Sequence, residues 1–404
     1  MTETTSRSAE PAVPAFPSDR SCPYHPAPGY APMGETRPLT RVRLFDGREA
    51  WLVTGHAEGR ALLADQRLSS EWGNPVFPVV VARTEGREGL SLPLIGVDDP
   101  EHARQRRMLI PSFGVKRMAA MRPVLQQEVD RLIDGILADG PTIDLVSRFA
   151  LPVPSIAICM LLGVPYDDHD LFEERSRDFV GAATSAEADA AFGALYGYLF
   201  DLVRGKQEQP GEGLLDELIT VQLAEGKLDH DELVKMAMVL LIAGHETTGN
   251  AISLGVLALL EHPEQLAALH ADDGLLPNAI EELLRFLSVS DFIVRLAVDD
   301  IQVGDQTIKA GDGVVLSIML MNRDGAAYED PDTLDLRRAA GRHVGFGHGI
   351  HQCLGQNLAR AELEIALGSL FTRIPTLKLA VPVDEIPISA GHDGQGPRVL
   401  PVTW

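Results

Sequence analysis

The sequence predicts a mainly α-helical single domain with small β-sheets. Apolar residues recur at helical spacing through most of residues 100–285, where proline and glycine interrupt the pattern only at intervals. Short apolar segments typical of strands flank this region, at residues 40–53 and 299–318. Although 404 residues are enough for two or three domains, no repeat, low-complexity tract or long linker divides the chain.

The first part of the chain is expected to form a leader and two strands. Residues 1–27 are rich in proline, serine, threonine and charge, so we expect a loose leader there and one domain over residues 28–404. Apolar and polar side chains alternate over residues 40–44, and residues 51–53 are apolar. Both segments predict short strands.

Two helices in the middle of the chain are the most informative. Asp98, Asp99, Pro100 and Glu101 predict a helix start, with an aspartate cap, proline at the first helical position and an acid in the first turn. A long helix is predicted over residues 229–261, and its apolar middle should cross the core.

After residue 285 the pattern changes to short elements. Residues 299–318 predict short strands joined by glycine-containing turns, and residues 323–342 are irregular and rich in aspartate, proline and arginine. A last helix is predicted from near Leu354, and a strand-like tail ends at Trp404.

The composition excludes several classes of protein. A formal net charge of −23 repels phosphate backbones, so we expect no nucleic-acid partner. No run of about 18 apolar residues is free of polar breaks, so we expect no membrane anchor. The three cysteines, Cys22, Cys159 and Cys353, are too few for a disulfide framework. These features predict a cytoplasmic protein, which we expect to be a monomer.

Cys353 lies in a glycine-rich segment directly before the last predicted helix. Gly345, Gly347 and Gly349 precede it and Gly355 follows, so the backbone has little side-chain cover and a flat ligand could approach closely. A helix N-terminus favours a thiolate, and a thiolate in apolar surroundings suits a soft, electron-donating bond to iron. The alternative is a buried structural cysteine in a glycine-rich turn. A phosphate-binding loop is excluded because its characteristic residues are missing.

Residues 243–248 read Ala-Gly-His-Glu-Thr-Thr within the helix predicted to cross the core. An acid and two hydroxyl groups are costly to bury there unless they are hydrogen-bonded. In the functional interpretation, Gly244 opens a groove for a small ligand, while Thr247 and Glu246 deliver protons. In the alternative, the threonines bond back to the helix and only mark a bend. A zinc-protease helix is excluded because Gly249 stands where its second histidine would be.

Two further pairs of residues have helical spacing. Glu282 and Arg285 are three residues apart, and His102 and Arg106 are four apart. Alone, the first pair is typical of a solvated helix face. The second pair could bind a carboxylate, although alone it is more typical of a protein surface.

Taken together and in this order, these motifs resemble those of the cytochromes P450, the haem-thiolate monooxygenases. Three motifs match the family's oxygen-activating helix, structural ion pair and cysteine-ligand loop, namely Ala243-Gly244-x-Glu246-Thr247, Glu282-x-x-Arg285 and Phe346-x-x-Gly349-x-x-x-Cys353-x-Gly355. The resemblance extends from about Ala15 to Trp404. Flanking segments are similar to the soluble actinobacterial branch, which takes electrons from ferredoxin and oxidises macrolides, terpenoids, vitamin D and xenobiotics.

The resemblance implies a haem b cofactor, iron protoporphyrin IX, and a role for each motif. Cys353 would be the axial ligand of the iron, Thr247 would hydrogen-bond dioxygen, and Glu246 would relay protons. The remaining haem-site residues would be Gly244, Phe346 and Gly355, together with four partners of the haem propionates, His102, Arg106, Arg295 and His351.

The resemblance also implies a structural role for the pair of Glu282 and Arg285. In the family this pair usually has a third arm, a histidine or arginine in the irregular segment before the cysteine loop. The chain has Thr333 at the position expected for it. Arg337 or Arg338 could substitute.

Electrons would come from NAD(P)H through a ferredoxin reductase and a ferredoxin. Residues 102–127 contain six basic residues and no acid. We expect Arg104, Arg107 and Lys116 to dock an acidic ferredoxin, because local charge of opposite sign steers encounter even when net charges repel. Arg106 would turn inward to the haem. The alternative is a solvated basic face without a partner.

The substrate pocket implied by the resemblance is mainly apolar, which predicts a lipophilic small-molecule substrate. Asp291 could orient a polar substituent, and so could His392. The expected pocket residues are Leu94, Leu240, Ala243, Thr248, Phe292, Ile293, Val294 and His392, with Val76, Phe77 and Ile95 nearby.

Three other functions compete with an oxygen-inserting enzyme. A peroxide-driven haem enzyme is one, although the intact pair of Glu246 and Thr247 favours dioxygen. A haem-based gas or redox sensor would need neither substrate nor electron donor. A cysteine hydrolase without haem would need a base that can reach the sulfur of Cys353. His351 is too close to Cys353 in sequence to be assigned as that base.

Overall fold

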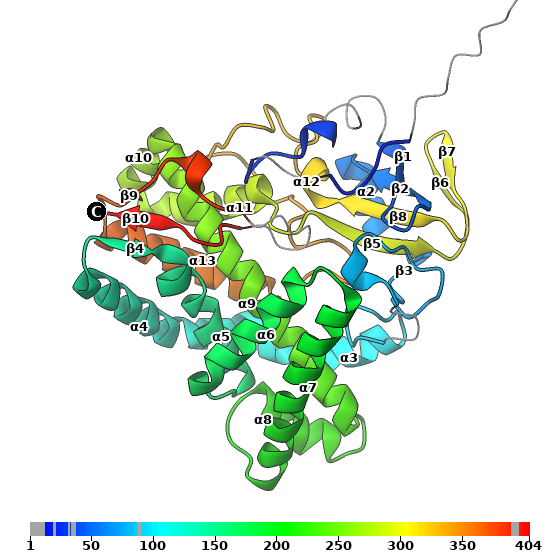
Figure 1. Cartoon of the computed structure of the whole chain (residues 1–404), viewed down its shortest axis with the longest axis horizontal. Coiled ribbons are helices and arrows are strands. Elements are labelled where there is room, and N and C mark those ends of the chain that lie inside the picture. The colour runs from blue at the N-terminus through cyan, green and yellow to red at the C-terminus, as the bar shows by residue number, and fades with distance from the viewer. Residues whose placement is uncertain (1–12, 19–21, 31–32, 34–37, 87–90, 389–395) are drawn as a thin grey trace, which may run out of the picture.

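Helix α9 (His230–Glu261) crosses the molecule, and the rest of the fold is arranged around it (Figure 1). Asp229 caps the helix, because its side chain accepts a hydrogen bond of 2.8 Å from the backbone N–H of Glu232. Residues 236–241 are all buried. The predicted long helix and its passage through the core are therefore confirmed.

The computed structural model describes residues 13–18, 22–30, 33, 38–86, 91–388 and 396–404. Helices dominate it, and its strands form small sheets, so the predicted fold class is confirmed. The other helices are α2 (His56–Leu63), α3 (Glu101–Leu109), α4 (Val115–Asp139), α5 (Pro152–Leu162), α6 (His169–Gly181), α7 (Ser185–Glu208), α8 (Leu214–Glu217), α10 (Pro263–Ala271), α11 (Leu276–Leu287), α12 (Ile318–Met321) and α13 (Gln356–Arg373).

The largest sheet has five strands in the order β1-β2-β8-β5-β3 and lies on the right in Figure 1. Strands β2 and β8 pair in parallel, and the other neighbours are antiparallel. A second sheet has the order β4-β10-β9, and β6 pairs with β7. The strands are β1 (Leu39–Arg43), β2 (Glu49–Val53), β3 (Leu68–Ser69), β4 (Thr142–Asp144), β5 (Phe292–Ala297), β6 (Ile301–Val303), β7 (Gln306–Ile308), β8 (Gly313–Ser317), β9 (Lys378–Leu379) and β10 (Pro401–Thr403).

The strands test the sequence predictions directly. Those expected at residues 40–44, 51–53 and 299–318 and at the tail are present. Strand β5 was not predicted, and it carries several expected pocket residues. Two apolar clusters lie on opposite faces of the five-stranded sheet, since Val314 and Leu316 belong to one and Val315 to the other. The largest cluster surrounds α9.

The prediction of a loose leader over residues 1–27 is wrong for residues 13–18 and 22–27. Phe16 is only 4% exposed and packs its ring against Tyr30 and Phe292. Its N–H donates to the carbonyl of Arg43 at 2.8 Å. Arg323 also donates to the carbonyl of Tyr24 at 2.5 Å. Burial of the aromatic rings outweighs the loop-like composition. Residues 1–12 and 19–21 lie outside the described residues.

The start of α3 differs slightly from the prediction. Pro100 precedes the helix rather than occupying its first position. Asp99 bonds the first turn, because its carboxylate accepts from Ala103 N–H at 3.0 Å. Asp98 instead accepts from the N–H of Ser70 at 2.7 Å, so it ties α3 to the segment after β3.

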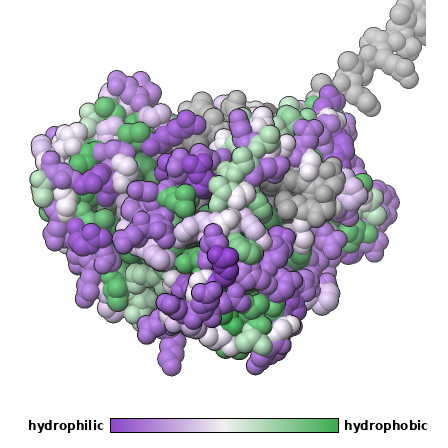
Figure 2. Space-filling view, turned by 60° about the horizontal axis from the view of Figure 1, so that its bottom comes forward, coloured by the Kyte–Doolittle hydropathy of each residue, from purple (hydrophilic) through white to green (hydrophobic). Residues whose placement is uncertain are grey.

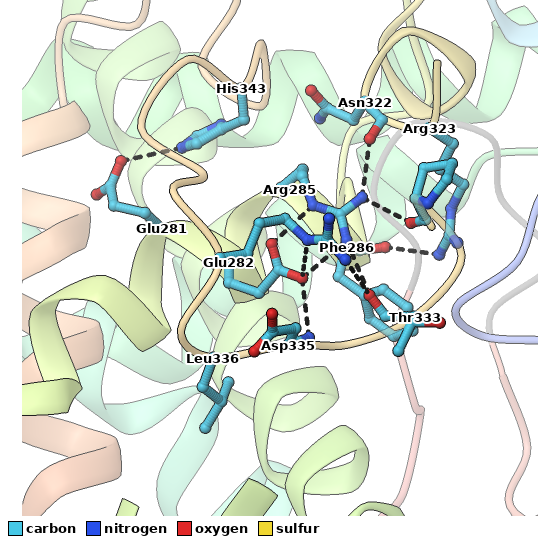
Figure 3. A network of polar contacts seen from close by, with 12 residues as sticks. Glu281, Glu282, Arg285, Phe286, Asn322, Arg323, Thr333, Asp335, Leu336 and His343 are labelled. Atoms are coloured by element: carbon cyan, nitrogen blue, oxygen red, sulfur yellow. Dashed lines mark hydrogen bonds and ion pairs between the residues drawn. The ribbon is translucent and has the colours of Figure 1, made fainter. Parts of the chain in front are cut away.

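Glu282 and Arg285 form a fully buried ion pair on α11 (Figure 3). The Arg285 guanidinium donates to both carboxylate oxygens of Glu282, at 2.7 and 2.8 Å. Arg338 supplies the third arm, because its Nε donates to Glu282 Oε1 at 3.1 Å. Thr333 contributes only its backbone carbonyl, and Arg337 lies near Asp272 instead. The expectation that the third arm falls at Thr333 is therefore wrong, and it falls five residues later, at Arg338.

Among the described residues, no helix combines the length and the apolar character that a membrane span requires. Figure 2 shows hydrophilic and hydrophobic residues interspersed in small groups over one face of the molecule. That pattern is common on protein surfaces, where scattered apolar side chains are normal.

Replacing Glu282 by glutamine should lower the free energy of unfolding by about 3–5 kcal/mol, because Arg285 then keeps a buried charge without its carboxylate. Thr333→Ala is the matched control, since the network uses its carbonyl and not its side chain. The control should change that free energy by less than about 0.5 kcal/mol. Denaturant unfolding measures both values. Equal losses in the two variants would contradict this assignment.

Candidate active site

A cavity of about 750 Å³ lies between α9, β5 and the loop that contains Cys353. It brings together residues that the sequence analysis selected from distant segments. They are Leu94, His102, Arg106, Leu240, Ala243, Gly244, Thr247, Thr248, Phe292, Ile293, Val294, Arg295, Phe346, His351, Cys353 and Gly355. Phe77 and Ile95 also line the cavity, whereas Glu246 and Val76 do not. His392 lies outside the described residues.

Cys353 is a free, partly buried cysteine that lines the cavity. Its N–H donates to the carbonyl of Phe346 at 2.9 Å, and α13 begins three residues later. Burial raises the pKa of the Cys353 thiol, while the N–H groups of Gly355 and Gln356 and the Arg106 guanidinium oppose that rise. The surroundings therefore offer several groups that stabilise a thiolate once a metal binds it.

The glycines around Cys353 serve different purposes. Gly345, Gly347 and Gly355 line the cavity, as expected if a flat ligand is to approach the backbone. Gly349 does not, and its φ is +77°. A Cβ there would lie 2.3 Å from the carbonyl oxygen of Leu63, so close packing against the end of α2 requires this glycine.

Four nitrogen-bearing side chains gather in one part of the cavity. The rings of His102 and His351 are 4.1 Å apart, and Ser70 Oγ lies 3.1 Å from His351 Nε2. Burial, with Arg295 next in effect, lowers the pKa of His351 to about 3. Arg106 donates to the carbonyl of Gln352 at 2.6 Å, which confirms that it turns inward.

The guanidinium of Arg295 lies in this group of side chains, and no described carboxylate is bonded to it. Burial lowers the pKa of its guanidinium to about 10. Within the described part of the chain, it donates to the carbonyl of Val294 and to no carboxylate, and the charge of Asp98 only partly offsets the effect of burial. A charged arginine is rarely left in such a position without an anionic partner. This part of the cavity is therefore suited to an anionic group of a ligand.

Thr247 and Glu246 occupy different sides of α9. The hydroxyl of Thr247 donates to the carbonyl of Ala243 at 2.8 Å, as predicted for a helical threonine, and the side chain also lines the cavity. Glu246 is turned away from the lining, and its buried Oε1 has no hydrogen-bond partner in the described structure. Burial raises the pKa of its carboxyl, and Arg177 of α6 opposes that effect.

Gly244 and His245 fit the helix packing in ways that the sequence did not show. A Cβ on Gly244 would lie 2.9 Å from Ile158 Cδ1, so this glycine makes room for α5 as well as lining the cavity. His245 is fully buried with its ring edge against Phe172. Neither of its ring nitrogens has a partner among the described residues, and burial lowers its pKa to about 3.

Comparison with known proteins places the chain among relatives of known fold. The family model described as Cytochrome P450 matches residues 202–377. The pentalenic acid synthase of Streptomyces avermitilis is 57% identical over 390 residues, which are 96% of this chain and 97% of that protein. The vitamin D3 dihydroxylase of Streptomyces griseolus is 50% identical over the full length of both chains. The crystal structure of CYP105D6 superposes with a TM-score of 0.88 at 67% identity, and the match covers 97% of this chain and 98% of that one.

The chain belongs to the cytochrome P450 family. The resemblance inferred from its motifs is confirmed, and the protein is a cytochrome P450 monooxygenase. Family membership implies a haem iron held by a cysteine thiolate.

The residues of this P450 fit such a haem. A free cysteine and three backbone glycines line the cavity. Arg106 and Arg295 lie where two carboxylates of a propionate-bearing ring would complete their charge, with His102 and His351 beside them. One thiol together with two guanidinium groups suits an anionic, thiolate-ligated porphyrin.

Two features of the P450 cavity were missed in the sequence analysis. Arg48, on the turn between β1 and β2, donates to the carbonyls of Val76 and Phe77 at 2.9 and 2.7 Å and pairs with Asp46. It thereby fixes the loop that forms one wall. Glu362 of α13 lines the cavity, and burial raises the pKa of its carboxyl well above the usual range. Neither residue belongs to a motif, so only the three-dimensional structure reveals them.

The structure corrects one of the three residues expected to dock the electron donor. Arg104 forms ion pairs with Glu101 and with Glu232 of α9, so its charge is locally neutralised. Arg107 and Lys116 are exposed, and neither has an ion pair among the described residues. Glu232 is distant from Arg104 along the chain, so charges counted within residues 102–127 do not include it.

Proposed function

We propose that this P450 inserts one oxygen atom from O2, by hydroxylation or epoxidation, into a lipophilic small molecule such as a secondary metabolite, a sterol-like or vitamin D-like compound or a xenobiotic. The observation that carries the proposal is the position of Cys353, whose free thiol adjoins a cavity with a mainly apolar lining. The relatives named pentalenic acid synthase and vitamin D3 dihydroxylase support this class of substrate.

Cys353 would hold the haem iron, and Arg106, Arg295, His102 and His351 would hold the propionates. Bound haem supplies the activation of dioxygen and the oxidising chemistry. The cationic cluster would then fix the orientation of the ring relative to α9. Gly244, Phe346 and Gly355 would lie against the ring, because all three line the cavity.

Thr247, which lines the cavity, and Glu246, on another side of α9, would together control the delivery of protons. The hydroxyl hydrogen of Thr247 points to the carbonyl of Ala243, which leaves the oxygen lone pairs available to accept a hydrogen bond in the cavity. Glu246 can hold a proton closer to neutral pH than an exposed glutamate, because burial raises its pKa. It would pass that proton toward Thr247 through water.

The substrate would lie against apolar residues from three segments. Three of these lining residues are Leu94 in the loop before α3, Leu240 on α9 and Phe292 on β5. Arg48 would keep the outer wall in place through its bonds to Val76 and Phe77. A lipophilic molecule therefore gains affinity from burial, while the fixed wall limits the orientations it can adopt.

Electrons would come from NAD(P)H through a ferredoxin reductase and a ferredoxin that docks beside the Cys353 loop. The bond from Arg106 to Gln352 places α3 against that loop, and Arg107 is exposed next to it in sequence. Lys116 adds a second exposed cation at the start of α4, and Ile110 and Val115 add exposed apolar surface between them. Apolar residues within a charged rim are typical of transient docking sites.

The decisive test of this function is the absorption spectrum of the ferrous carbonyl complex, measured for the native protein and for Cys353→Ser. The holoprotein should show the red-shifted Soret band of a thiolate-ligated ferrous carbonyl complex, and Cys353→Ser should lose that band because its oxygen donates less electron density. Cys159→Ser is the matched control, since that buried cysteine does not line the cavity. A normal band in Cys353→Ser would refute the proposal.

Thr247→Ala should lower the product formed per NAD(P)H by about tenfold or more and raise peroxide release, because proton delivery then lacks its hydroxyl. Thr247→Ser keeps the hydroxyl and should restore coupling. The measurement uses the ligand that gives the largest Soret shift in a screen of lipophilic compounds including vitamin D3. Unchanged coupling in the alanine variant would remove Thr247 from the mechanism.

Arg107→Glu should slow reduction by ferredoxin, and the difference from the native protein should shrink as salt is added, because salt screens the charges. Arg204→Glu on α7 makes the same change of charge on another helix and serves as the control. Stopped-flow reduction rates at several ionic strengths provide the measurement. Equal rates for the native protein and Arg107→Glu would locate the docking site elsewhere.

A further inference from the structure

Three side chains tie the loop before Cys353 to two helices. Glu281 of α11 binds the guanidinium of Arg360 of α13 with both carboxylate oxygens, at 2.5 and 3.0 Å. Its Oε2 also lies 3.2 Å from Nε2 of His343. Figure 3 shows Glu281 and His343 pointing toward each other, away from the buried pair of Glu282 and Arg285. We refer to Glu281, His343 and Arg360 as the proximal triad.

The hydrogen bonds of His343 define its tautomer. The N–H of Gly345 donates to His343 Nδ1 at 3.0 Å, so Nδ1 is an acceptor and the proton lies on Nε2. That proton is donated to Glu281. His343 is almost fully buried, and both ring nitrogens are satisfied. A neutral imidazole therefore connects α11 to the backbone at the beginning of the cysteine loop.

Arg360 brings a positive charge close to the same loop. Its guanidinium lies over the ring of Phe346, 4.6 Å from the ring centroid. Phe346 lines the cavity and accepts the hydrogen bond from the N–H of Cys353 at 2.9 Å. Arg360 is also among the groups that oppose the rise of the Cys353 pKa. The cation is thus near enough to act on the charge of the sulfur.

Glu281 balances that cation. Burial alone would raise the pKa of Glu281, but hydrogen bonds from His343 and Arg360 lower it to about 2. The carboxylate is therefore charged near neutral pH, where it balances the guanidinium charge of Arg360. Without Glu281, the charge of Arg360 would act on the sulfur without compensation.

We propose that the proximal triad is a charge-balanced positioning device that sets how strongly Cys353 donates electrons to the iron, and hence the reduction potential of the iron. The proposal rests on the proposed ligation of iron by Cys353. The three residues act through Phe346 and the loop, and none of them is a catalytic residue. The sign of each effect follows from electrostatics: uncompensated positive charge favours the reduced iron, which carries one more electron, and uncompensated negative charge disfavours it.

The test is a pair of substitutions with opposite expected signs, measured by spectroelectrochemistry of the holoprotein. Glu281→Gln should raise the reduction potential, and Arg360→Gln should lower it. Each change should alter the equilibrium constant for reduction by about tenfold, which is about 59 mV for one electron. The double variant should lie between the two single variants, near the native value. Loosening of the loop alone would move both single variants in the same direction.

Two further variants separate charge from loop anchoring. Glu364→Gln, one turn further along α13, removes an acid that pairs with Arg122. This control should change the equilibrium constant for reduction of the iron by less than about twofold. His343→Asn keeps an acceptor for the N–H of Gly345, because asparagine accepts from the N–H two residues on, but it cannot reach Glu281. This variant should keep the Soret band of the carbonyl complex and shift the potential less than Glu281→Gln.

Potentials that shift in the same direction in Glu281→Gln and Arg360→Gln, or that match the Glu364→Gln control, would overturn the proposal. The ferrous carbonyl spectrum of the native protein distinguishes this failure from failure of the proposed function. A native protein without the thiolate band refutes ligation by Cys353 itself. A native protein with the band, and single variants without opposite shifts, refutes only the role of the triad.

Discussion

The loop from Gly345 to Cys353 is held in place by close backbone packing rather than by a regular element. Gly349 allows this loop to approach α2, and a Cβ on Gly345 would lie only 3.0 Å from the carbonyl of Leu284 on α11. The hydrogen bond from Cys353 to Phe346 then closes the loop. The position of the sulfur therefore depends on contacts with two helices, and α13 extends directly from the same loop. A metal ligand on a loop needs such support to keep a fixed geometry.

The parts of the site that depend on local sequence could be predicted, and those that depend on distant partners could not. The spacing of the motif that contains Thr247 is enough to place this residue on a helix. The spacing around Cys353 is enough to place it directly before one. Strand β5 was missed because neither of its partners is its neighbour in the chain: β3 lies near the beginning, and β6 and β7 lie between β5 and β8. The neutralisation of Arg104 by Glu232 was missed for the same reason. Arg338 was only one of two possibilities until its distance to Glu282 was known.

The distribution of charge differs between the surface and the interior. The chain has 58 acidic and 35 basic residues, yet Arg106 and Arg295 both line the cavity together with two histidines. Burial lowers the pKa of both histidines, so the positive charge there is that of the two guanidinium groups, which repel one another until an anionic ligand joins them. Binding of such a ligand stabilises the folded state, since the unfolded chain lacks the cluster. We infer that cofactor binding and folding are energetically linked in this P450.

The neutral imidazole inside α9 makes the protein sensitive to acid. His245 has a pKa of about 3 when folded and about 6.5 when exposed, so only the unfolded chain takes up its proton between these values. Above about pH 6.5 both states are neutral and the residue has no effect on stability. Between about pH 6.5 and about pH 3, each pH unit of acidification lowers the free energy of unfolding by about 1.4 kcal/mol through this residue alone. Because His245 precedes Glu246 and Thr247 in the same helical turn, acid unfolding that begins here would first disorder the part of the cavity wall that Thr247 forms.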